Sequence, residues 1–128
     1  MLDANLCIRV LRDRPAHISD RFKAEAPTLA ISTVVLLELL YGAERSDRPE
    51  FQRQQVSGFA DHLTVYNFDK PAAWETALIK ANLAARGQII GPNDLLIAGH
   101  ARSLGLKLIT GNLREFSRVE GLRCEDWT

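Results

Sequence analysis

The sequence predicts an α/β domain of three layers, in which helices cover both faces of a mainly parallel central sheet. One observation is that short strand-like segments alternate with helical ones along the chain, as they do in βαβ units. A second is that the 128 residues, 46% hydrophobic and 25% charged, have the size and composition of one folding unit. No linker, internal repeat or low-complexity stretch divides the chain, so we expect a single domain over residues 1–128.

Strand and helix signals alternate from the first residues onward. Met1 to Asp3 is expected to be the end of a first, very short strand, and a helix is expected from Asn5 to Arg12. A second helix is expected from Pro15 to Glu25. Pro27 breaks that helix, because proline cannot continue it, and Thr28 to Ser32 predicts a compact strand.

The middle of the chain predicts two helices followed by a strand. Ser32 or Thr33 can cap the first helix, which runs to about Ser46. Pro49 opens the second helix, since proline is favoured in a first turn. The next strand is expected from Leu63 to Tyr66.

The last part of the chain predicts two further helices and two strands. Asp69 can cap the first helix, which ends at Gly87, because its carboxylate can accept hydrogen bonds from free amides of the first turn. Gly91 and Pro92 lead into the second helix, which ends at Gly105. The two strands are expected at Lys107 to Thr110 and, as an edge strand, at Leu122 to Trp127.

Charge and cysteine content exclude several classes of protein. Sixteen basic and sixteen acidic residues cancel, so no overall field draws the chain to nucleic acid or membrane. Cys7 and Cys124 are too few and too far apart for a disulfide framework or a zinc site, and we expect two buried thiols. The chain starts without a signal-peptide pattern, and no apolar run approaches the ~20 residues that span a bilayer. We therefore expect a cytoplasmic protein.

Four acidic residues lie at junctions where a carboxylate is unusual. Asp3 follows the first strand, Glu38 interrupts an apolar helix, Asp94 lies in the first turn of a helix, and Glu115 follows the strand ending at Thr110. Ligands of parallel α/β sheets bind outside the carboxyl ends of the strands, so all four acids can reach one edge. Converging carboxylates repel unless a divalent cation lies between them, and such oxygen ligands suit Mg²⁺ or Mn²⁺. The pattern therefore predicts a metal-dependent phosphodiesterase.

Each acid also has an explanation that needs no metal. Asp3 could be surface charge, Asp94 is favourable at a helix N-terminus on dipole grounds alone, and Glu115 could be solvated beside neighbouring arginines. Glu38 resists such an explanation best, because leucine and valine flank it for four residues on its N-terminal side and leucine follows it. The three histidines, His17, His62 and His100, lack metal-ligand spacing and are not expected to be catalytic.

Several sequence blocks, taken together, resemble one known family. These blocks are Met1–Asn5, Ile31–Val34 continuing into Glu38–Glu44, Gly91–Asp94 with Ile97–Ala101, and Thr110–Phe116. In this order and at these intervals they resemble the PIN-domain toxins of the VapC type, over essentially the whole chain. The resemblance implies a PIN-like fold and a Mg²⁺-dependent endoribonuclease that leaves a 5′-phosphate and a 3′-hydroxyl. It also implies inhibition by a cognate VapB-type antitoxin.

The resemblance implies a role for each polar residue of the site. Asp3 and Asp94 would hold the metal, Glu38 would ligate it or orient a bound water, and Glu115 would be the fourth acid. Asn5 and Asn112 would support the carboxylates through hydrogen bonds. This chain departs from the family at Ala4, where a hydroxyl residue is common, and at Asn112, where many PIN domains have an aspartate.

The resemblance also implies partners. The ending Gly121–Trp127 is similar to the branch of the family that cuts initiator tRNA in its anticodon stem-loop, so tRNA is the expected substrate. A homodimer is expected, with DNA contacted only through the antitoxin complex and no membrane contact. Apolar residues of three helices are expected to divide between the core and an antitoxin groove, with at least half in the core. They are Val10, Leu11, Ile18, Phe22, Phe51 and Phe59.

One other function remains open at this point, and a second is set aside. The first is a binding module of the same fold whose acidic cluster is idle, which Ala4 and Asn112 favour and which a metal titration would test. The second is a phospho-acceptor receiver domain. That class needs an acidic pair after the first strand and a lysine after the last parallel strand, whereas Asp3 stands alone and Gly111 follows Thr110.

Overall fold

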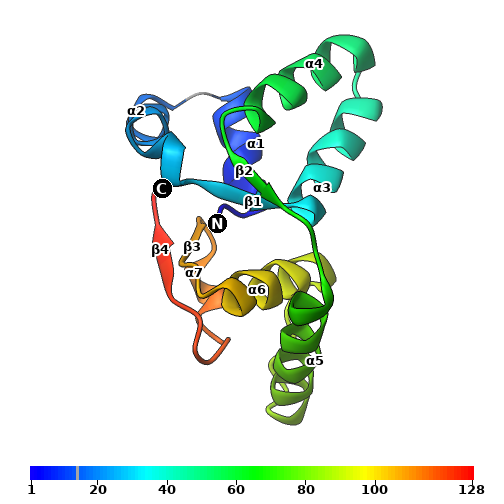
Figure 1. Ribbon diagram of the computed structural model, residues 1–128, viewed down its shortest axis with the longest axis vertical. Coiled ribbons are helices and arrows are strands. Elements are labelled where there is room, and N and C mark those ends of the chain that lie inside the picture. Colours follow the sequence, from blue (N-terminus) through cyan, green and yellow to red (C-terminus); the bar gives the residue numbers. More distant parts are fainter. Residues whose placement is uncertain (14) are drawn as a thin grey trace.

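A small parallel sheet lies at the centre of the molecule, between a layer of helices α1 to α4 and a layer containing α5 and α6 (Figure 1). This computed structural model describes residues 1–13 and 15–128. The strands are β1 (Ala30–Ser32), β2 (Thr64–Tyr66), β3 (Leu108–Thr110) and β4 (Cys124–Asp126). The α/β class and the three layers predicted from the sequence are confirmed.

The sheet is built from two parallel pairs, β1 with β2 and β3 with β4, which Leu2 connects. The Leu2 amide donates to the Ala30 carbonyl at 2.8 Å, and Leu2 forms a parallel bridge with Ile109. The register pairs Ser32 with Tyr66 and Thr110 with Asp126. These last residues of the strands and Asp3, directly after Leu2, therefore share the carboxyl edge of the sheet.

The helices begin and end close to the positions predicted from the sequence. They are α1 (Ala4–Arg12), α2 (Ala16–Glu25), α3 (Thr33–Glu44), α4 (Pro49–Ala60), α5 (Lys70–Ala85), α6 (Pro92–Leu104) and α7 (Leu113–Phe116). The short helix α7 and a 3₁₀ turn, η1 (Ala26–Thr28), were not predicted. The turn shortens the strand that we expected to begin at Thr28.

Local capping chemistry sets several of these boundaries. Ser32 caps α3 by accepting a hydrogen bond from the Val34 amide at 3.1 Å, and Asp69 caps α5 in the same way through the Ala72 amide. Gly105 ends α6 with a φ of 66°, a left-handed conformation that glycine adopts without steric cost. The predicted caps and stop are confirmed, so the local sequence fixes the start of α3 and the end of α6, the helices that carry Glu38 and Asp94.

A close helix crossing holds α6 in place. Helices α5 and α6 share the most extensive contact between any two elements that the described residues form. A Cβ atom on Gly99 would lie 1.9 Å from Thr76 Oγ1 and 2.7 Å from the Thr76 Cα. Only glycine allows this approach, so the depth at which α6 packs depends on that one missing methyl group.

The two cysteines differ in their environment. Cys7 is fully buried, whereas Cys124 is only half-buried because it lies on the edge strand β4, and both are free thiols. The expectation of two buried thiols is therefore wrong for Cys124. None of the helices described in residues 1–13 and 15–128 is long and apolar enough to cross a membrane.

Candidate active site

Asp3 is the most buried of the four acids, with 2% of its surface exposed. It is the N-cap of α1, where its Oδ1 accepts a hydrogen bond from the Leu6 amide at 2.9 Å. Its Oδ2 accepts a hydrogen bond from Thr110 Oγ1 at 2.5 Å. Burial raises the pKa of Asp3, and these two hydrogen bonds oppose that rise by stabilising the carboxylate. Both oxygens are therefore held in fixed directions.

A chain of hydrogen bonds continues from Thr110 to Glu115. Thr110 Oγ1 also accepts from the Asn112 amide at 2.8 Å. The Asn112 side chain caps α7 and donates from Nδ2 to Glu115 Oε2 at 2.7 Å. The other oxygen of Glu115 accepts from the Gly91 amide at 2.7 Å. Glu115 is thus held inside the site and is not a solvated side chain beside neighbouring arginines.

Asp94 is the acid on which the charges of the other three act. It lies in the first turn of α6, is about half-buried, and has a pKa raised to about 7. Burial is the largest cause, followed by the charge of Glu115 and a hydrogen bond with it, and then by the charges of Asp3 and Glu38. A Cβ atom on Gly91 would lie 3.5 Å from Asp94 Oδ2 and 3.6 Å from Glu115 Oε1, so Gly91 borders both carboxylates.

Glu38 lies on α3, half-buried, where this helix faces α1 and α4. It lines a groove of about 450 Å³ between the three helices. Arg12 borders the groove together with Glu38, and its apolar wall includes Ile8, Leu11, Leu39, Ala43 and Val56. Glu38 therefore borders an open groove although its neighbours along the helix are apolar.

Only part of the apolar set named from the sequence lines that groove. Ile18, Phe22 and Phe59 are buried, and the rings of Phe22 and Phe59 stack at 5.2 Å. Phe51 is 42% exposed and Leu11 lines the groove. At least three of the six side chains are therefore in the core, as expected for half or more of the set.

The acids form no ion pair within residues 1–13 and 15–128. Neighbouring carboxylates that have no ion pair among these residues form a site that attracts a cation. In the same part of the chain, no group of three or more His, Cys, Asp or Glu side chains is placed to hold a metal ion. Mg²⁺ is usually held by one or two carboxylates and several waters, so an all-oxygen site of this kind fits Mg²⁺ or Mn²⁺.

The two asparagines named from the sequence have different surroundings. Asn112 bonds to Glu115, as described above. Asn5 is exposed in the first turn of α1, and no side-chain hydrogen bond involves it among the residues described, so its supporting role stays a prediction. Ala4 is buried beside it.

Three residues in or near the site were not among the site residues predicted from the sequence. Thr110 links Asp3 to the Asn112 backbone, and a hydroxyl residue at the end of a buried strand was the available signal. The charge of Asp126, at the end of β4, raises the pKa of Asp3. His100, which we did not expect to be catalytic, is fully buried, with Nδ1 2.8 Å from Ser32 Oγ.

Known proteins resemble this chain over almost its whole length. The PIN domain family model matches residues 1–122. The chain is 47% identical to the "tRNA(fMet)-specific endonuclease VapC" of Shigella flexneri over 128 residues, covering all of this chain and 97% of that protein. It is 43% identical to "Ribonuclease VapC2" of Haemophilus influenzae, covering 99% and 96%.

Two solved structures from the same comparisons have a closely similar fold. The DNA-bound VapBC structure of Salmonella typhimurium superposes with a TM-score of 0.97 at 47% identity, covering 100% of this chain and 97% of the other. VapBC2 of Rickettsia felis, bound to a promoter DNA fragment, superposes with a TM-score of 0.95 at 32% identity, covering 100% and 98%.

Proposed function

We propose that this chain, which belongs to the VapC family of PIN-domain ribonucleases, is a metal-dependent endoribonuclease that cuts tRNA and is inhibited by a cognate antitoxin. The observation that carries the metal-dependent part is the convergence of Asp3, Glu38, Asp94 and Glu115 without an ion pair in the described chain. Burial and the charges of the neighbouring acids raise the pKa of Asp94 to about 7, and a cation bound among these acids would offset that repulsion.

The residues of the chain would divide the work of hydrolysis. Asp3 and Asp94 would hold Mg²⁺ or Mn²⁺, which supplies a water of lowered pKa and neutralises charge on the phosphate. The Leu6 amide and Thr110 orient the carboxylate of Asp3, so that its position is fixed before a ligand arrives. Glu38, which lines the groove between α1, α3 and α4, would ligate the metal or orient a bound water.

Glu115 is proposed as the fourth acid. Its two oxygens accept hydrogen bonds from the Gly91 amide and from Asn112, which place it beside Asp94. Asn112 therefore supports Glu115 directly, in the position where many members of the family have an aspartate.

The substrate proposal rests on the close relatives. The Shigella flexneri and Salmonella typhimurium proteins, each 47% identical to this chain, are named tRNA(fMet)-specific endonucleases. We infer that this chain also cuts initiator tRNA, in the anticodon stem-loop. The test is incubation of the purified protein with total tRNA and Mg²⁺, followed by mapping of the product ends.

The expected products are two tRNA fragments with a new 5′-phosphate and 3′-hydroxyl. Asp94→Asn should reduce cleavage by more than about 100-fold, the range seen when one group that stabilises transition-state charge is removed. Asp69→Asn is the matched control, because Asp69 caps α5 and asparagine can also cap a helix. Cleavage that survives Asp94→Asn, or that proceeds fully in chelator, would contradict the proposal.

The groove between α1, α3 and α4 is the proposed antitoxin site. Its apolar wall suits an amphipathic helix, and Glu38 at its border would let a basic side chain of the partner reach the acids. The structures of the Salmonella and Rickettsia proteins are complexes of VapB with VapC bound to DNA, so we propose that DNA is contacted only through such a complex. Co-expression with the neighbouring reading frame, then co-purification, tests this.

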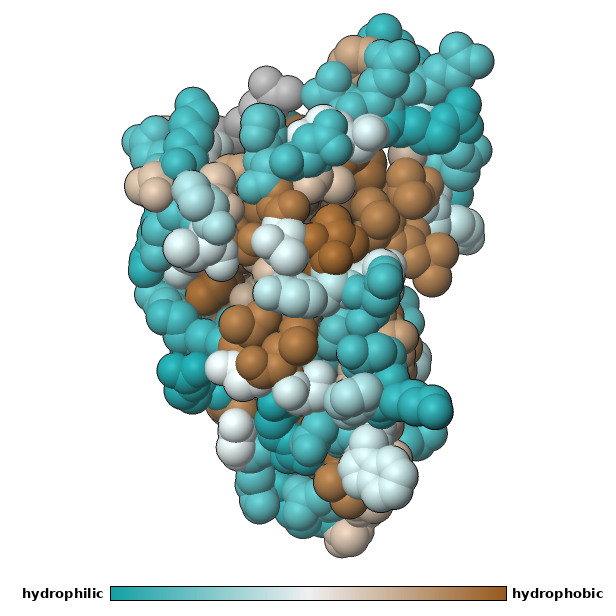
Figure 2. Space-filling model, viewed as in Figure 1, coloured by the Kyte–Doolittle hydropathy of each residue, from teal (hydrophilic) through white to brown (hydrophobic). Residues whose placement is uncertain are grey.

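A second copy of the chain is the proposed partner for another surface. Apolar side chains gather over α3 and β2 (Figure 2). Leu37 is 66% exposed and Tyr41 61% exposed on α3. We propose a homodimer that covers part of this surface, since solvated apolar area of this kind marks an interface. Light scattering should give the mass of a dimer for the chain and of a monomer for Leu37→Glu.

A further inference from the structure

His100 is a fully buried histidine at the contact between α6, which carries Asp94, and the start of α3, which carries Glu38. It belongs to α6, and its exposed fraction is 0%. Its Nδ1 lies 2.8 Å from the hydroxyl of Ser32, the residue that caps α3. Its Nε2 has no hydrogen-bond partner among the described residues. An apolar side chain would fill this space without burying an unpaired polar atom, so the histidine needs another explanation.

The hydrogen bonds of Ser32 decide which way the contact with His100 runs. Ser32 Oγ already accepts from the Val34 amide, so its single proton is free to be donated to Nδ1. That assignment puts the imidazole proton on Nε2. Burial lowers the pKa of His100, while the charge of Asp69 and the Asn67 backbone act in the opposite direction. The ring is therefore neutral at physiological pH.

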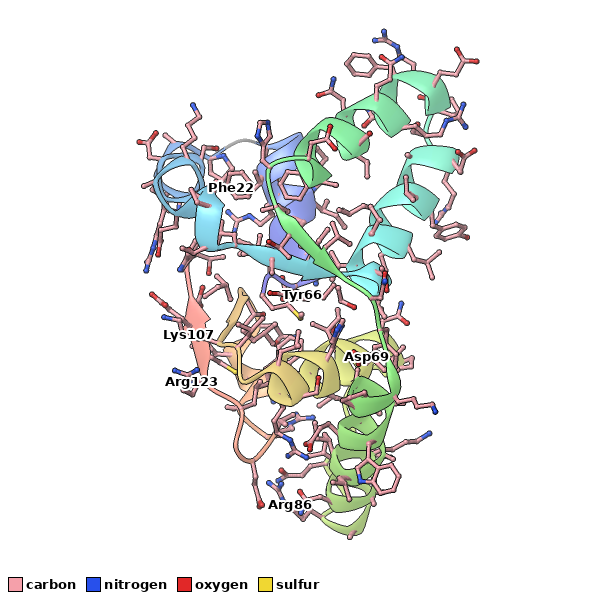
Figure 3. All side chains as sticks on the ribbon, in the orientation of Figure 1. Phe22, Tyr66, Asp69, Arg86, Lys107 and Arg123 are labelled. Carbon is pink, nitrogen blue, oxygen red and sulfur yellow. The ribbon has the colours of Figure 1, made fainter. Side chains whose placement is uncertain are left out.

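Aromatic side chains hold the ring in its place. The ring of Phe68 meets it edge-on at 5.5 Å and the ring of Tyr66 at 6.5 Å. Tyr66 is the last residue of β2, and Phe68 lies in the connection from β2 to α5. Tyr66 and Asp69, which border this connection, are labelled in Figure 3. The Phe68 amide also donates to Thr33 Oγ1 at 3.1 Å, in the first turn of α3. The start of α3, the β2–α5 connection and α6 thus meet at His100.

We propose that the hydrogen bond between His100 and Ser32 is a positioning contact that sets the distance between Glu38 and Asp94. The inference rests on the proposed function, because it assigns a role to His100 in the same acidic site. His100 does not contact the acids itself and acts through the two helices.

The spacing along the two helices supports this role. Glu38 follows Ser32 by six residues, and His100 follows Asp94 by six residues. At 1.5 Å per residue, the contact lies about 9 Å along each helix from the acid that the helix carries. A change of angle between α3 and α6 at His100 therefore moves the two carboxylates relative to each other. A misplacement of about 1 Å at a reacting centre can cost on the order of 100-fold in rate.

Two similar substitutions separate positioning from simple packing. In His100→Asn, the polar atoms of the side chain occupy the position of Nδ1, so the contact with Ser32 is kept. In His100→Gln, they occupy a position close to Nε2, and the contact with Ser32 is lost. Both variants place a polar side chain that fills the space of the imidazole ring less well. We therefore expect similar losses in the free energy of unfolding.

The first measurement is the affinity of the protein for Mn²⁺. Electron paramagnetic resonance monitors the concentration of the free ion during the titration. His100→Gln should weaken Mn²⁺ binding by about 10-fold or more, the range found for residues that orient metal ligands, and His100→Asn should fall below that range. Ser32→Ala removes the same contact together with the α3 cap, so it should weaken Mn²⁺ binding at least as much as His100→Gln. Adding His100→Gln to Ser32→Ala should weaken it little further, because the shared contact is already lost. Ile79→Val, a buried change on α5, controls for lost stability.

The second measurement needs no metal. Nitroxide labels at Glu44→Cys on α3 and Leu104→Cys on α6, in a Cys124→Ser background, report the distance between the helices. His100→Gln should broaden or shift the distance distribution, and His100→Asn should keep it. Equal distributions in both variants, or equal Mn²⁺ affinities, would overturn the inference. If the unsubstituted protein itself binds no Mn²⁺, the proposed function fails, and the label distances alone then decide the role of His100.

Discussion

Single side chains in this molecule connect strand ends that are far apart in the sequence. Thr110 is the clearest case, because its one hydroxyl group donates to Asp3 and accepts from the Asn112 amide. Asp3 is in turn the cap of α1, so the same residue orders the first helix and a proposed metal ligand. The acids are therefore supported by neutral groups, which hold them without cancelling their charge.

Replacing Thr110 tests this support. Thr110→Val keeps the shape of the side chain but leaves Asp3 Oδ2 and the Asn112 amide without partners in a buried region. We expect the free energy of unfolding to fall by about 1–3 kcal/mol, the cost of a buried polar group left unsatisfied. Thr110→Ser retains the hydroxyl and should cost less. Urea unfolding measures both, and equal losses would show that the methyl group matters more than the hydrogen bonds.

The pKa of Asp94 predicts a pH dependence of the metal-free protein. Its value is about 7 in the folded chain against an ordinary 3.8, so the folded state binds more protons than the unfolded state between these values. The stabilising contribution of protonated Asp94 is fully present below about pH 4, and it is lost as the pH rises to about 7. In chelator, the melting temperature should therefore fall between pH 5 and pH 8.

The comparison with Asp94→Asn isolates this effect. Asparagine does not titrate, so the decrease in melting temperature between pH 5 and pH 8 should be smaller in the variant. The melting temperature of the variant at pH 8 without metal should equal or exceed that of the unsubstituted chain, because one charge is removed from a repelling cluster. Parallel pH curves for the two proteins would contradict the assignment.

At the scale of the elements, the crossing of α5 and α6 positions Asp94. The helices approach so closely at Gly99 that a methyl group would overlap both the side chain and the backbone of Thr76. The crossing therefore cannot accept a larger side chain unless the helices separate, and any separation moves the N-terminal turn of α6 in the acidic site.

Gly99→Ala should destabilise the fold by about 1–3 kcal/mol, as overpacking of a filled interior does. Gly58→Ala on α4 is the matched control, because nothing lies within 4 Å of a Cβ atom there. Alanine favours a helix over glycine by up to about 1 kcal/mol, so the control should be neutral or stabilising. Thermal unfolding of both variants decides between packing and helix propensity.

At the scale of the whole molecule, the acids oppose folding as long as no cation balances them. The proposed metal binds the folded chain only, since the acids come from four separate segments that converge on folding. Mn²⁺ at millimolar concentration should therefore raise the melting temperature. When the ion is at 100 times its dissociation constant, the free energy of unfolding should increase by about 2.7 kcal/mol. Glu38→Gln should reduce this increase. Identical melting curves with Mn²⁺ and with chelator would show that the cluster is idle.

The sequence by itself determined the features that depend on near neighbours in the chain. Ser32 and Asp69 as caps, Pro92 at the start of α6 and Gly105 at its end follow from chemistry within four residues, and all were predicted. A shared edge for the four acids was also predicted from local structure, because each acid closely follows a strand or lies in an early turn of a helix.

Only the tertiary structure decided the features that depend on distant groups. Burial at Phe22 needs Phe59, the exposure of Cys124 follows from its place on an edge strand, and the pKa of Asp94 depends on Glu115. The contact of His100 with Ser32 joins residues 68 positions apart. Hydrogen bonds, burial and Coulomb interactions act through space, so their partners are fixed only once the chain has folded.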